Sequence, residues 1–380
     1  MASQQQVTAR FGLPTSPLAR VLHQIRTTQS DRTLLHTQLG LSQASATRYV
    51  AALLDAGLVE EQFNTADSTK AGRPRITLRV DGSHLLVWGA HVGVSSAEIV
   101  ICDVSGRIIR QRRLPLAAKH LHPKEHLFAL ATALQALAVG LPEPVDVGIA
   151  FSSHVDRQGC IDSSEYGWKG ADVATLLHEA FGRRVTVATG VLAMAGAEIA
   201  ATPIAGEHWP STLYFYAREV VSHAWIFNGI VHYPHTGRKP SALRPGPGPH
   251  GLAPLSVKPI LGRAAELGFE VKTFAELVEA AKNSEQLRTM FHERAEAMGQ
   301  AIAAAVDFVD PEVVVCAGEA FTLDSQTLET TKSILQADHH SAAHLQIQQA
   351  ERNIVQRAAM QVALNGFQHD PLAYANETAP

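Results

Sequence analysis

The first 80 residues carry an excess of the side chains that bind polyanions. They contain nine Lys and Arg against five Asp and Glu, a net charge of +4. The whole chain carries −4, so residues 81–380 carry −8. Guanidinium and ammonium groups pair with phosphate oxygens, and clustered cations are the electrostatic signature of nucleic-acid binding. The charge distribution therefore predicts that the N-terminal part meets a polyanion such as DNA.

The segment KAGRPR, residues 70–75, holds three of these cations. Proline fixes its own backbone and pushes the preceding residue toward extended conformations. We therefore expect Arg73 to lie on an extended arm that enters a narrow minor groove and reads its width and A·T content. Lys70 and Arg75 would add attraction that does not depend on sequence. A basic linker that merely tolerates proline is the alternative.

Apolar spacing predicts the helices that would position the other cations. Three stretches have apolar residues at helical spacing. Their predicted inward positions are, in chain order, Leu18, Val21, Leu22 and Ile25; Leu34, Leu35 and Leu39; and Ala46, Val50, Leu53 and Leu54. Gly40 suits the end of the second helix, and Ser42 suits the N-cap of the third.

The second and third helices, joined by a turn around Gly40 and Leu41, match a helix-turn-helix, whose second helix lies in the major groove. The outward residues near the start of that helix are short or polar, as entry into the groove requires. They are Gln43, Ala44, Ser45, Thr47 and Arg48. The stretches GLVEEQF and RITLRV then alternate like two strands of a wing. The alternative is a three-helix packing unit whose third helix is solvated.

Three histidine groups have side chains that could ligate a metal. They are His120, His122 and His126; His232, His235 and His250; and His339, His340 and His344. Pairs at i, i+4 on a helix can bind metals. These groups, however, are predicted to lie in solvated, loop-like runs, so we expect no metal site and no cofactor.

Length and composition limit the class of protein. A chain of 380 residues with 46% hydrophobic and 18% charged residues is typical of a globular protein of two or three domains. Cys102, Cys160 and Cys316 are odd in number and far apart, which argues against a disulfide framework. No run of about 18 apolar residues exists, and the N-terminus lacks the apolar core of a signal peptide. We therefore expect a cytoplasmic protein with no membrane partner.

The order of these parts resembles the regulator branch of the ROK family (repressor, ORF, kinase). A winged helix, a GRP linker and the hairpin WGAHVGVSSAEIVICDVSG at 88–106 carry the resemblance, which covers nearly the whole chain. It implies an α/β fold with a winged helix-turn-helix and linker at 1–80. Two lobes of an actin-like, ribonuclease H-like sugar-kinase domain would follow at 84–205 and 206–380. The last helix, about 353–368, would pack back on the first lobe.

The resemblance also locates the residues that a kinase would need in the first lobe. The family motif D-x-G-x-T reads His91 to Ser95 here, so an imidazole replaces the carboxylate that organises magnesium and phosphates. The sugar-binding motif E-N-D-A-N reads Ala188 to Leu192, with Thr189 and Gly190 in place of the asparagine and the general base. Glu198 is the nearest surviving acid, and a surface or lobe-packing carboxylate is its alternative interpretation.

The later landmarks are altered in the same way. The second phosphate loop reads Ala217 to Val221, without glycine and with Glu219, which would repel phosphate. Residues 232–261 lack the cysteines of the family's zinc cluster. The sugar-binding element there begins at Arg238 and would suit an anionic effector, with a solvated basic loop as the alternative. One of the family's paired adenosine-contacting glycines persists, as Gly318.

These replacements predict a DNA-binding transcriptional regulator, a repressor by family resemblance and tied by it to carbohydrate metabolism, and not an enzyme. Its body would be a catalytically inactive sugar-kinase domain that dimerises. A possible effector cleft would be lined by His91, Thr189, Gly190, Glu198 and Arg238. The alternatives are an active sugar kinase fused to a DNA-binding module, and a body that only dimerises. A homodimer or homotetramer would place paired recognition helices on half-sites of a double-stranded operator about one turn apart.

Overall fold

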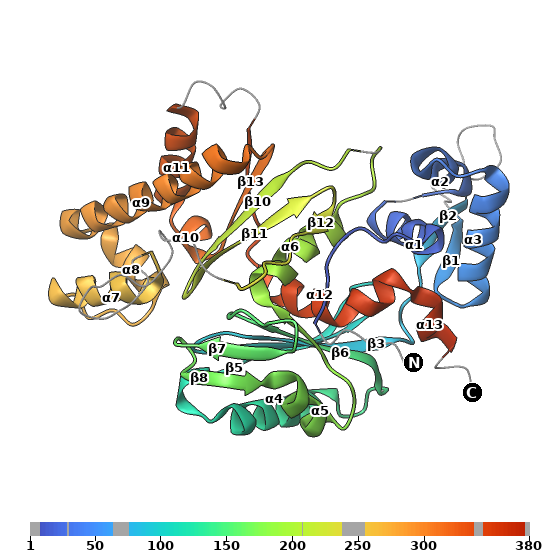
Figure 1. The fold of residues 1–380 in the computed structure, drawn as a ribbon, viewed down its shortest axis with the longest axis horizontal. Coiled ribbons are helices and arrows are strands. Elements are labelled where there is room, and N and C mark those ends of the chain that lie inside the picture. The colour runs from blue at the N-terminus through green and yellow to red at the C-terminus, as the bar shows by residue number, and fades with distance from the viewer. Residues whose placement is uncertain are drawn as a thin grey trace. The chain divides into compact units, whose positions relative to one another are not determined.

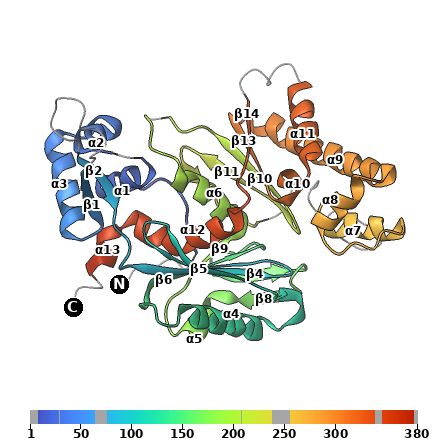
Figure 2. The same ribbon diagram turned by 180° about the vertical axis from the view of Figure 1, so that it is seen from behind.

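The chain forms two compact units, and the first is built from both ends of the sequence. A computed structural model of the chain describes residues 8–28, 30–63, 76–206, 208–237, 255–337 and 345–376. The first unit comprises residues 1–209 with 355–380, and the second comprises residues 210–354. Figures 1 and 2 show the elements of both units from opposite sides.

Three helices and a hairpin begin the first unit. They are α1 (Pro17–Thr27), α2 (Arg32–Leu39), α3 (Gln43–Asp55), β1 (Val59–Phe63) and β2 (Ile76–Val80), with β1 and β2 antiparallel. Ser16, Asp31 and Ser42 cap the three helices, each accepting a hydrogen bond from the backbone N–H three residues on. Gly40 ends α2 in the left-handed conformation, with φ of 63°. The predicted turn between α2 and α3 is therefore confirmed.

The predicted inward face of α2 is partly wrong. Leu35 is fully buried, whereas Leu34 is 39% exposed. Successive residues of an α-helix point about 100° apart, so with Leu35 at the centre of the buried face Leu34 lies at its edge. The predicted face of α3 is confirmed at Ala46, Val50 and Leu53, which are fully buried.

A five-stranded sheet forms the first lobe. Its strands are β3 (Leu86–Val92), β4 (Ala97–Asp103), β5 (Ile108–Leu114), β6 (Pro144–Phe151) and β9 (Thr186–Thr189), in the order β5-β4-β3-β6-β9. The predicted hairpin at 88–106 is confirmed as β3 and β4, which pair antiparallel, whereas β3, β6 and β9 run parallel. The other elements are a 3-10 turn (Ala118–His120), α4 (Pro123–Ala138), the hairpin β7 (Cys160–Ser163) and β8 (Trp168–Asp172), α5 (Val173–Phe181), α6 (Gly190–Ala201), α12 (Ile354–His369) and α13 (Pro371–Asn376).

Helices cover both faces of this sheet, with α4 and α5 on one side and α12 on the other (Figure 1). Gly89 of β3 and Gly148 of β6 are partners in the parallel register. A Cβ on Gly89 would clash with the backbone of Ala359, and a Cβ on Gly148 would clash with the backbone of Ala363. The two glycines therefore let the backbone of α12 lie directly on the sheet.

The second unit repeats this strand order. Its strands are β10 (Thr212–Ala217), β11 (Val221–Phe227), β12 (Ile230–Val231), β13 (Val313–Ala317) and β14 (Gln346–Gln349), in the order β12-β11-β10-β13-β14. The helices are α7 (Val257–Glu266), α8 (Phe274–Ala281), α9 (Glu285–Val309), α10 (Glu319–Thr322) and α11 (Ser325–Ala337). Again the first strand pairs antiparallel with the second and parallel with the fourth. Across the described ranges, every helix is too short or too polar to cross a bilayer.

The N-terminal helices and the first lobe share one hydrophobic core. Val21 of α1, Leu53 of α3 and Leu78 of β2 belong to the same cluster of buried residues as Val87 of β3 and Phe367 of α12. The expected boundaries at residues 80 and 84 therefore fall inside one compact unit.

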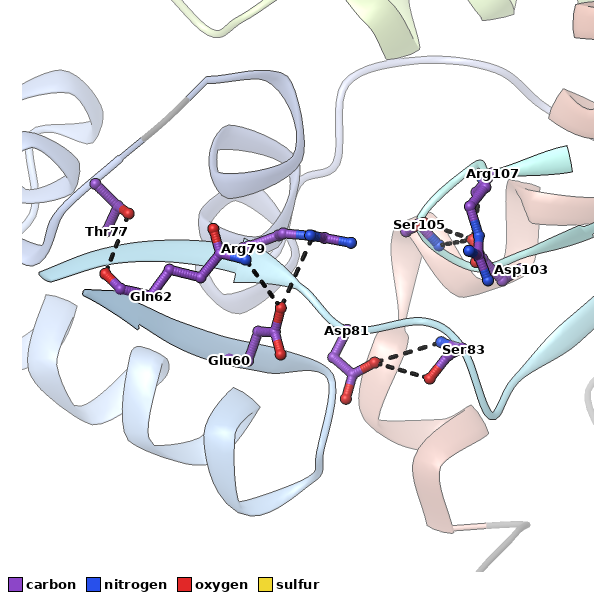
Figure 3. Close-up of polar contacts among 9 residues, drawn as sticks. All are labelled: Glu60, Gln62, Thr77, Arg79, Asp81, Ser83, Asp103, Ser105 and Arg107. Carbon is purple, nitrogen blue, oxygen red and sulfur yellow. Dashed lines mark hydrogen bonds and ion pairs between the residues drawn. The ribbon is translucent and has the colours of Figure 1, made fainter. Parts of the chain in front are cut away.

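The connection between β2 and β3 is short and tightly held. Asp81 N donates to Leu58 O at 2.9 Å, and the Asp81 carboxylate accepts from the backbone and hydroxyl of Ser83 (Figure 3). A Cβ on Gly82 would lie 2.5 Å from Ser105 N, so the connection packs against the turn between β4 and β5. That turn is itself fixed, because Asp103 accepts from Ser105 and Arg107. The hairpin β1–β2 is thus joined to the lobe without a slack linker.

Candidate functional site

The outer face of α3 exposes the residues that the sequence selected. Gln43, Ala44, Thr47 and Arg48 are exposed, and Ser45 is half-buried. Ala46 and Val50, on the opposite side, are fully buried, so the apolar spacing of the sequence fixes which residues face outward. Small and polar side chains next to one guanidinium can approach a groove closely and donate to base edges or phosphates.

Arg48 rests on its neighbour Tyr49. The Arg48 Nη2 lies 3.4 Å from the Tyr49 hydroxyl, and the guanidinium carbon lies 5.1 Å from the centre of the Tyr49 ring. Both contacts are at the surface, where a cation–π contact contributes about 0.5–1 kcal/mol. A phosphate or a guanine edge can replace such a contact at small cost.

The hairpin β1–β2 presents polar side chains on its surface. Glu60 and Arg79 are partners in the register, with a carboxylate–guanidinium distance of 3.8 Å, and the Thr77 hydroxyl donates to Gln62 O at 3.3 Å (Figure 3). Arg32 of α2 pairs with Glu61 of β1 at 2.8 Å, which ties the hairpin to the helices. Lys70, Arg73 and Arg75 lie outside the described residues, so their role on an arm stays a prediction.

His91 lies at the carboxyl end of β3, directly beside the first residue of α6. It is 2% exposed, and its Nε2 lies 3.4 Å from the Ser152 hydroxyl. A Cβ on Gly190 would lie 2.8 Å from His91 Nε2 and 2.9 Å from Phe151 O. The imidazole therefore fills the space that a side chain at position 190 would need. We call His91, Ser152, Thr189 and Gly190 the first-lobe site.

Another predicted cleft residue, Glu198, does not join this site. Glu198 lies eight residues along α6 from Gly190, about 12 Å at the rise of an α-helix. Its carboxylate lies 3.8 Å from Arg357 Nη1 of α12, which is a lobe-packing contact. Thr189 is next to Gly190, and its hydroxyl accepts a hydrogen bond from Val155 N at 2.9 Å. Arg238 lies outside the described residues.

The predicted phosphate loop of the second unit holds an ion pair. Arg218 Nε lies 2.9 Å from a carboxylate oxygen of Glu319, the first residue of α10. The Arg218 side chain is 15% exposed, so this ion pair is largely shielded from solvent on the arginine side. Gly318 has φ of 97°, and a Cβ there would clash with Ala217 O. Close packing of the ends of β10 and β13 is therefore sufficient reason for glycine at 318.

His126 is not a solvated loop residue, contrary to expectation. It lies inside α4 with no exposed area, and its ring meets the edge of Trp168 at 5.4 Å. Burial lowers its pKa to about 4, because the imidazolium would lose its hydration. The residues that the structure describes contain no group of three or more His, Cys, Asp or Glu side chains that could hold a metal. His250, His339, His340 and His344 lie outside them.

The sequence did not reveal a set of contacts between α1 and the end of α6. Arg26 Nη2 donates to Ala200 O at 2.7 Å, and His23 Nε2 donates to Thr202 O at 2.8 Å. Gln24 accepts from Ile204 N at 3.0 Å. The only signal for them is the composition of GVLAMAGAEIAA, residues 190–201, whose small side chains let other segments approach closely.

Sequence comparison finds relatives named as regulators. The chain is 29% identical over 374 residues to a protein of Mycobacterium tuberculosis named as a transcriptional regulator, covering 90% of this chain and 83% of that one. A protein of Mycobacterium bovis with the same type of name matches equally well. No family model matches the chain.

Structure comparison finds ROK proteins. A ROK family transcriptional regulator, described as a homologue of the E. coli MLC protein, covers 95% of this chain and all of its own, with a TM-score of 0.71 and 15% identity. A ROK family glucokinase from Streptomyces griseus, solved with glucose and AMPPNP, covers 73% of this chain and 98% of its own, with a TM-score of 0.61 and 16% identity. A ROK hexokinase from Thermus thermophilus covers 74% of this chain and 97% of its own, with a TM-score of 0.57 and 20% identity. These similarities confirm the resemblance that the sequence indicated, and they show the mixed α/β fold.

Proposed function

We propose that this chain, which has the fold of ROK-family proteins, is a sequence-specific DNA-binding transcriptional regulator whose kinase-like body transfers no phosphoryl group. The exposed face of α3, with Gln43, Ala44, Thr47 and Arg48, carries the proposal. In it, α1 to α3 and the hairpin β1–β2 are a winged helix, and α3 is the recognition helix. The names of the mycobacterial relatives support the same function.

DNA recognition would then use two grooves. Residues 43–48 of α3 would enter the major groove, where Arg48 can bond guanine bidentately or brace a phosphate. Arg73 would enter the adjacent minor groove from the arm, with Lys70 and Arg75 on phosphates. This division assigns sequence reading to α3 and groove-width reading to the arm.

The catalytic inactivity of the body is supported at both halves of the expected active site. The first-lobe site offers an imidazole and a glycine where phosphoryl transfer needs two carboxylates. The expected phosphate loop holds the Arg218–Glu319 ion pair and no glycine. An active sugar kinase fused to a DNA-binding module is therefore the weaker proposal, although ROK kinases share the fold.

We further propose a two-fold homodimer, or a dimer of such dimers, as the DNA-binding form. Two-fold symmetry would place two copies of α3 in successive major grooves about 34 Å apart. A small molecule bound by the body would be the natural effector. Light scattering tests the assembly, and a thermal-shift screen of sugars, sugar phosphates and other anionic metabolites tests the effector.

Selection of duplexes from a random library by the purified protein tests the DNA-binding function. The proposal expects one enriched motif with two half-sites, bound more tightly than random duplex by a factor of about 10³ or more. A variant with Gln43→Ala, Thr47→Ala and Arg48→Ala should lose this preference. Arg112→Ala removes an exposed arginine from β5, far along the chain from α3, and is the matched control. Failure of the wild type to enrich any sequence would overturn the proposal.

A further inference from the structure

We propose that α6 is the element through which the first-lobe site controls the position of the DNA-binding helices. The inference rests on the proposed function for its biological meaning, but the mechanical coupling can be measured without DNA. It is carried by three sets of contacts, at the start, the middle and the end of α6.

Helix α6 is almost entirely buried and rich in small residues. Ten of its twelve residues are buried, and between Gly190 and Ala201 it contains a single charged residue, Glu198. Packed interiors respond to displacement by shifting whole elements, because close-packed side chains leave little room for local adjustment. A push at one end of α6 is therefore transmitted along about 18 Å to the other end.

The start of α6 touches the first-lobe site directly. The 2.8 Å distance between a Cβ at position 190 and His91 Nε2 leaves no space between the helix and the imidazole. The N-cap Thr189 makes no capping bond to α6, because its hydroxyl accepts from Val155 N. A change in the position of His91 or of residues 152–155 therefore acts on the first turn of the helix.

The N-terminal segment packs against the middle of α6. Ala9 N donates to Val187 O at 2.9 Å, and Thr8 forms a parallel bridge with Val187, so the segment extends the first-lobe sheet at β9. Phe11 is 3% exposed, and a Cβ on Gly196 would lie 2.5 Å from its ring. The absence of a side chain at Gly196 thus leaves room for the Phe11 ring. The segment from residue 8 leads directly into α1, which starts at Pro17.

The end of α6 is held by α1 itself. Arg26 and His23 donate to Ala200 O and Thr202 O, two carbonyls at the C-terminal end where the helix carries partial negative charge. Gln24 is 1% exposed and binds on both sides, accepting from Ile204 N and donating to Gln38 of α2 at 2.9 Å. A displaced α6 therefore moves α1 and, through Gln24, the helix that precedes α3.

The test perturbs the first-lobe site and reads out α1. Gly190→Ala places a methyl group against His91, and His91→Ala removes the imidazole from the same contact. If one of the two variants does not fold, the other still tests the coupling. We expect hydrogen–deuterium exchange to increase in peptides 8–16 and 17–27 of either folded variant. Phe11→Ala should raise exchange in the same peptides with the first-lobe site intact. Leu134→Ala creates a void in α4, within the core that the first-lobe sheet forms with α4 and α5, and should leave these peptides unchanged.

Operator binding supplies the second readout. Gly190→Ala should weaken operator binding about 5-fold or more, within the range of allosteric couplings. In an Arg26→Gln background, where the end of α6 is already released, the same substitution should change affinity by less than about twofold. Unchanged exchange in 8–16 and 17–27 for both first-lobe variants would overturn the inference. If the wild type selects no DNA, the proposed function fails while the exchange result still decides the coupling.

Discussion

His91 and Gly190 lie next to each other, and the side chain at one position limits the side chain at the other. The imidazole occupies the space beside position 190, so an aspartate restored at 190 alone would collide with His91. The sequence identified each missing carboxylate separately, but it could not show that the two positions are in contact, because they lie 99 positions apart. An aspartate introduced at 91 alone would therefore leave the site without a general base at 190. An aspartate introduced at 190 alone would have no room beside His91.

Arg48 and Arg73 should affect DNA binding differently. Arg48→Ala should weaken operator binding by about 1–3 kcal/mol and relax the preference at one base pair, because a bidentate contact to guanine is lost. Arg73→Ala should weaken binding mainly where the flanking sequence is A·T-rich, since a narrow groove concentrates negative potential. Fluorescence titration of each variant on operator, flank-swapped operator and random duplex measures both effects. Wild-type binding by both variants would mean that the winged helix does not dock as proposed.

Two buried histidines should make the protein sensitive to acid. Burial holds the pKa of His126 at about 4, and burial together with Arg26 does the same for His23. The ordinary value is about 6.5, so between pH 6.5 and 4 the unfolded chain binds more protons. As the pH is lowered through that window, the free energy of unfolding should therefore fall by about 1.4 kcal/mol per pH unit for each histidine.

Denaturant unfolding at several pH values checks this slope. His126→Leu should reduce it by the contribution of one histidine, because the variant keeps the apolar contact with Trp168 and has no proton to take up. His178→Leu removes an exposed histidine of α5 and serves as the control. Equal slopes for wild type and His126→Leu would show that His126 is protonated in the folded chain.

At the scale of elements, periodicity and capping residues were sufficient for the three N-terminal helices and the hairpin that follows them. Ser42 and Gly40 locate the ends of α3 and α2 because their roles are local. The contacts of α1 with the end of α6 were not predictable, because they join residues about 180 positions apart and use two backbone carbonyls and one backbone N–H, which leave no mark in the sequence. His126 was misplaced for a related reason, since a polar residue inside an apolar helix gives no local signal of burial.

Two glycine substitutions should have opposite effects on stability. Gly148→Ala should lower the free energy of unfolding by about 1–3 kcal/mol, because the methyl group would enter the backbone of α12 at Ala363. Gly262→Ala, in the exposed middle of α7 with no heavy atom within 4 Å of the added Cβ, should raise it by up to about 1 kcal/mol. Denaturant titrations of the two variants measure both changes. A neutral Gly148→Ala would show that α12 does not lie against the sheet at this point.

At the scale of the whole molecule, the two units share one strand order, and the sequence of each lacks residues that the family motifs would have there. In the first unit, the N-terminal helices and the sheet share one hydrophobic core. The second has closed its expected phosphate loop with the Arg218–Glu319 ion pair. The strand order does not need the family's polar residues, because it depends on packing between apolar residues. In the expected phosphate loop, Ala217 and Val221 themselves belong to the core cluster of the second unit.

The protein should therefore form no sugar phosphate from ATP, magnesium and a panel of hexoses and amino sugars. Phosphoryl transfer needs an anion to hold the metal and a carboxylate to orient the attacking hydroxyl, and positions 91 and 190 supply neither. A coupled assay for ADP and direct detection of sugar phosphate measure the reaction, with an active ROK glucokinase as the positive control. The double variant His91→Asp with Gly190→Asp should still be inactive, because the phosphate loop at 217–221 remains without glycine. Turnover by the wild type that scales with protein concentration and is lost in Arg218→Ala would contradict this prediction and favour a kinase fused to a DNA-binding module.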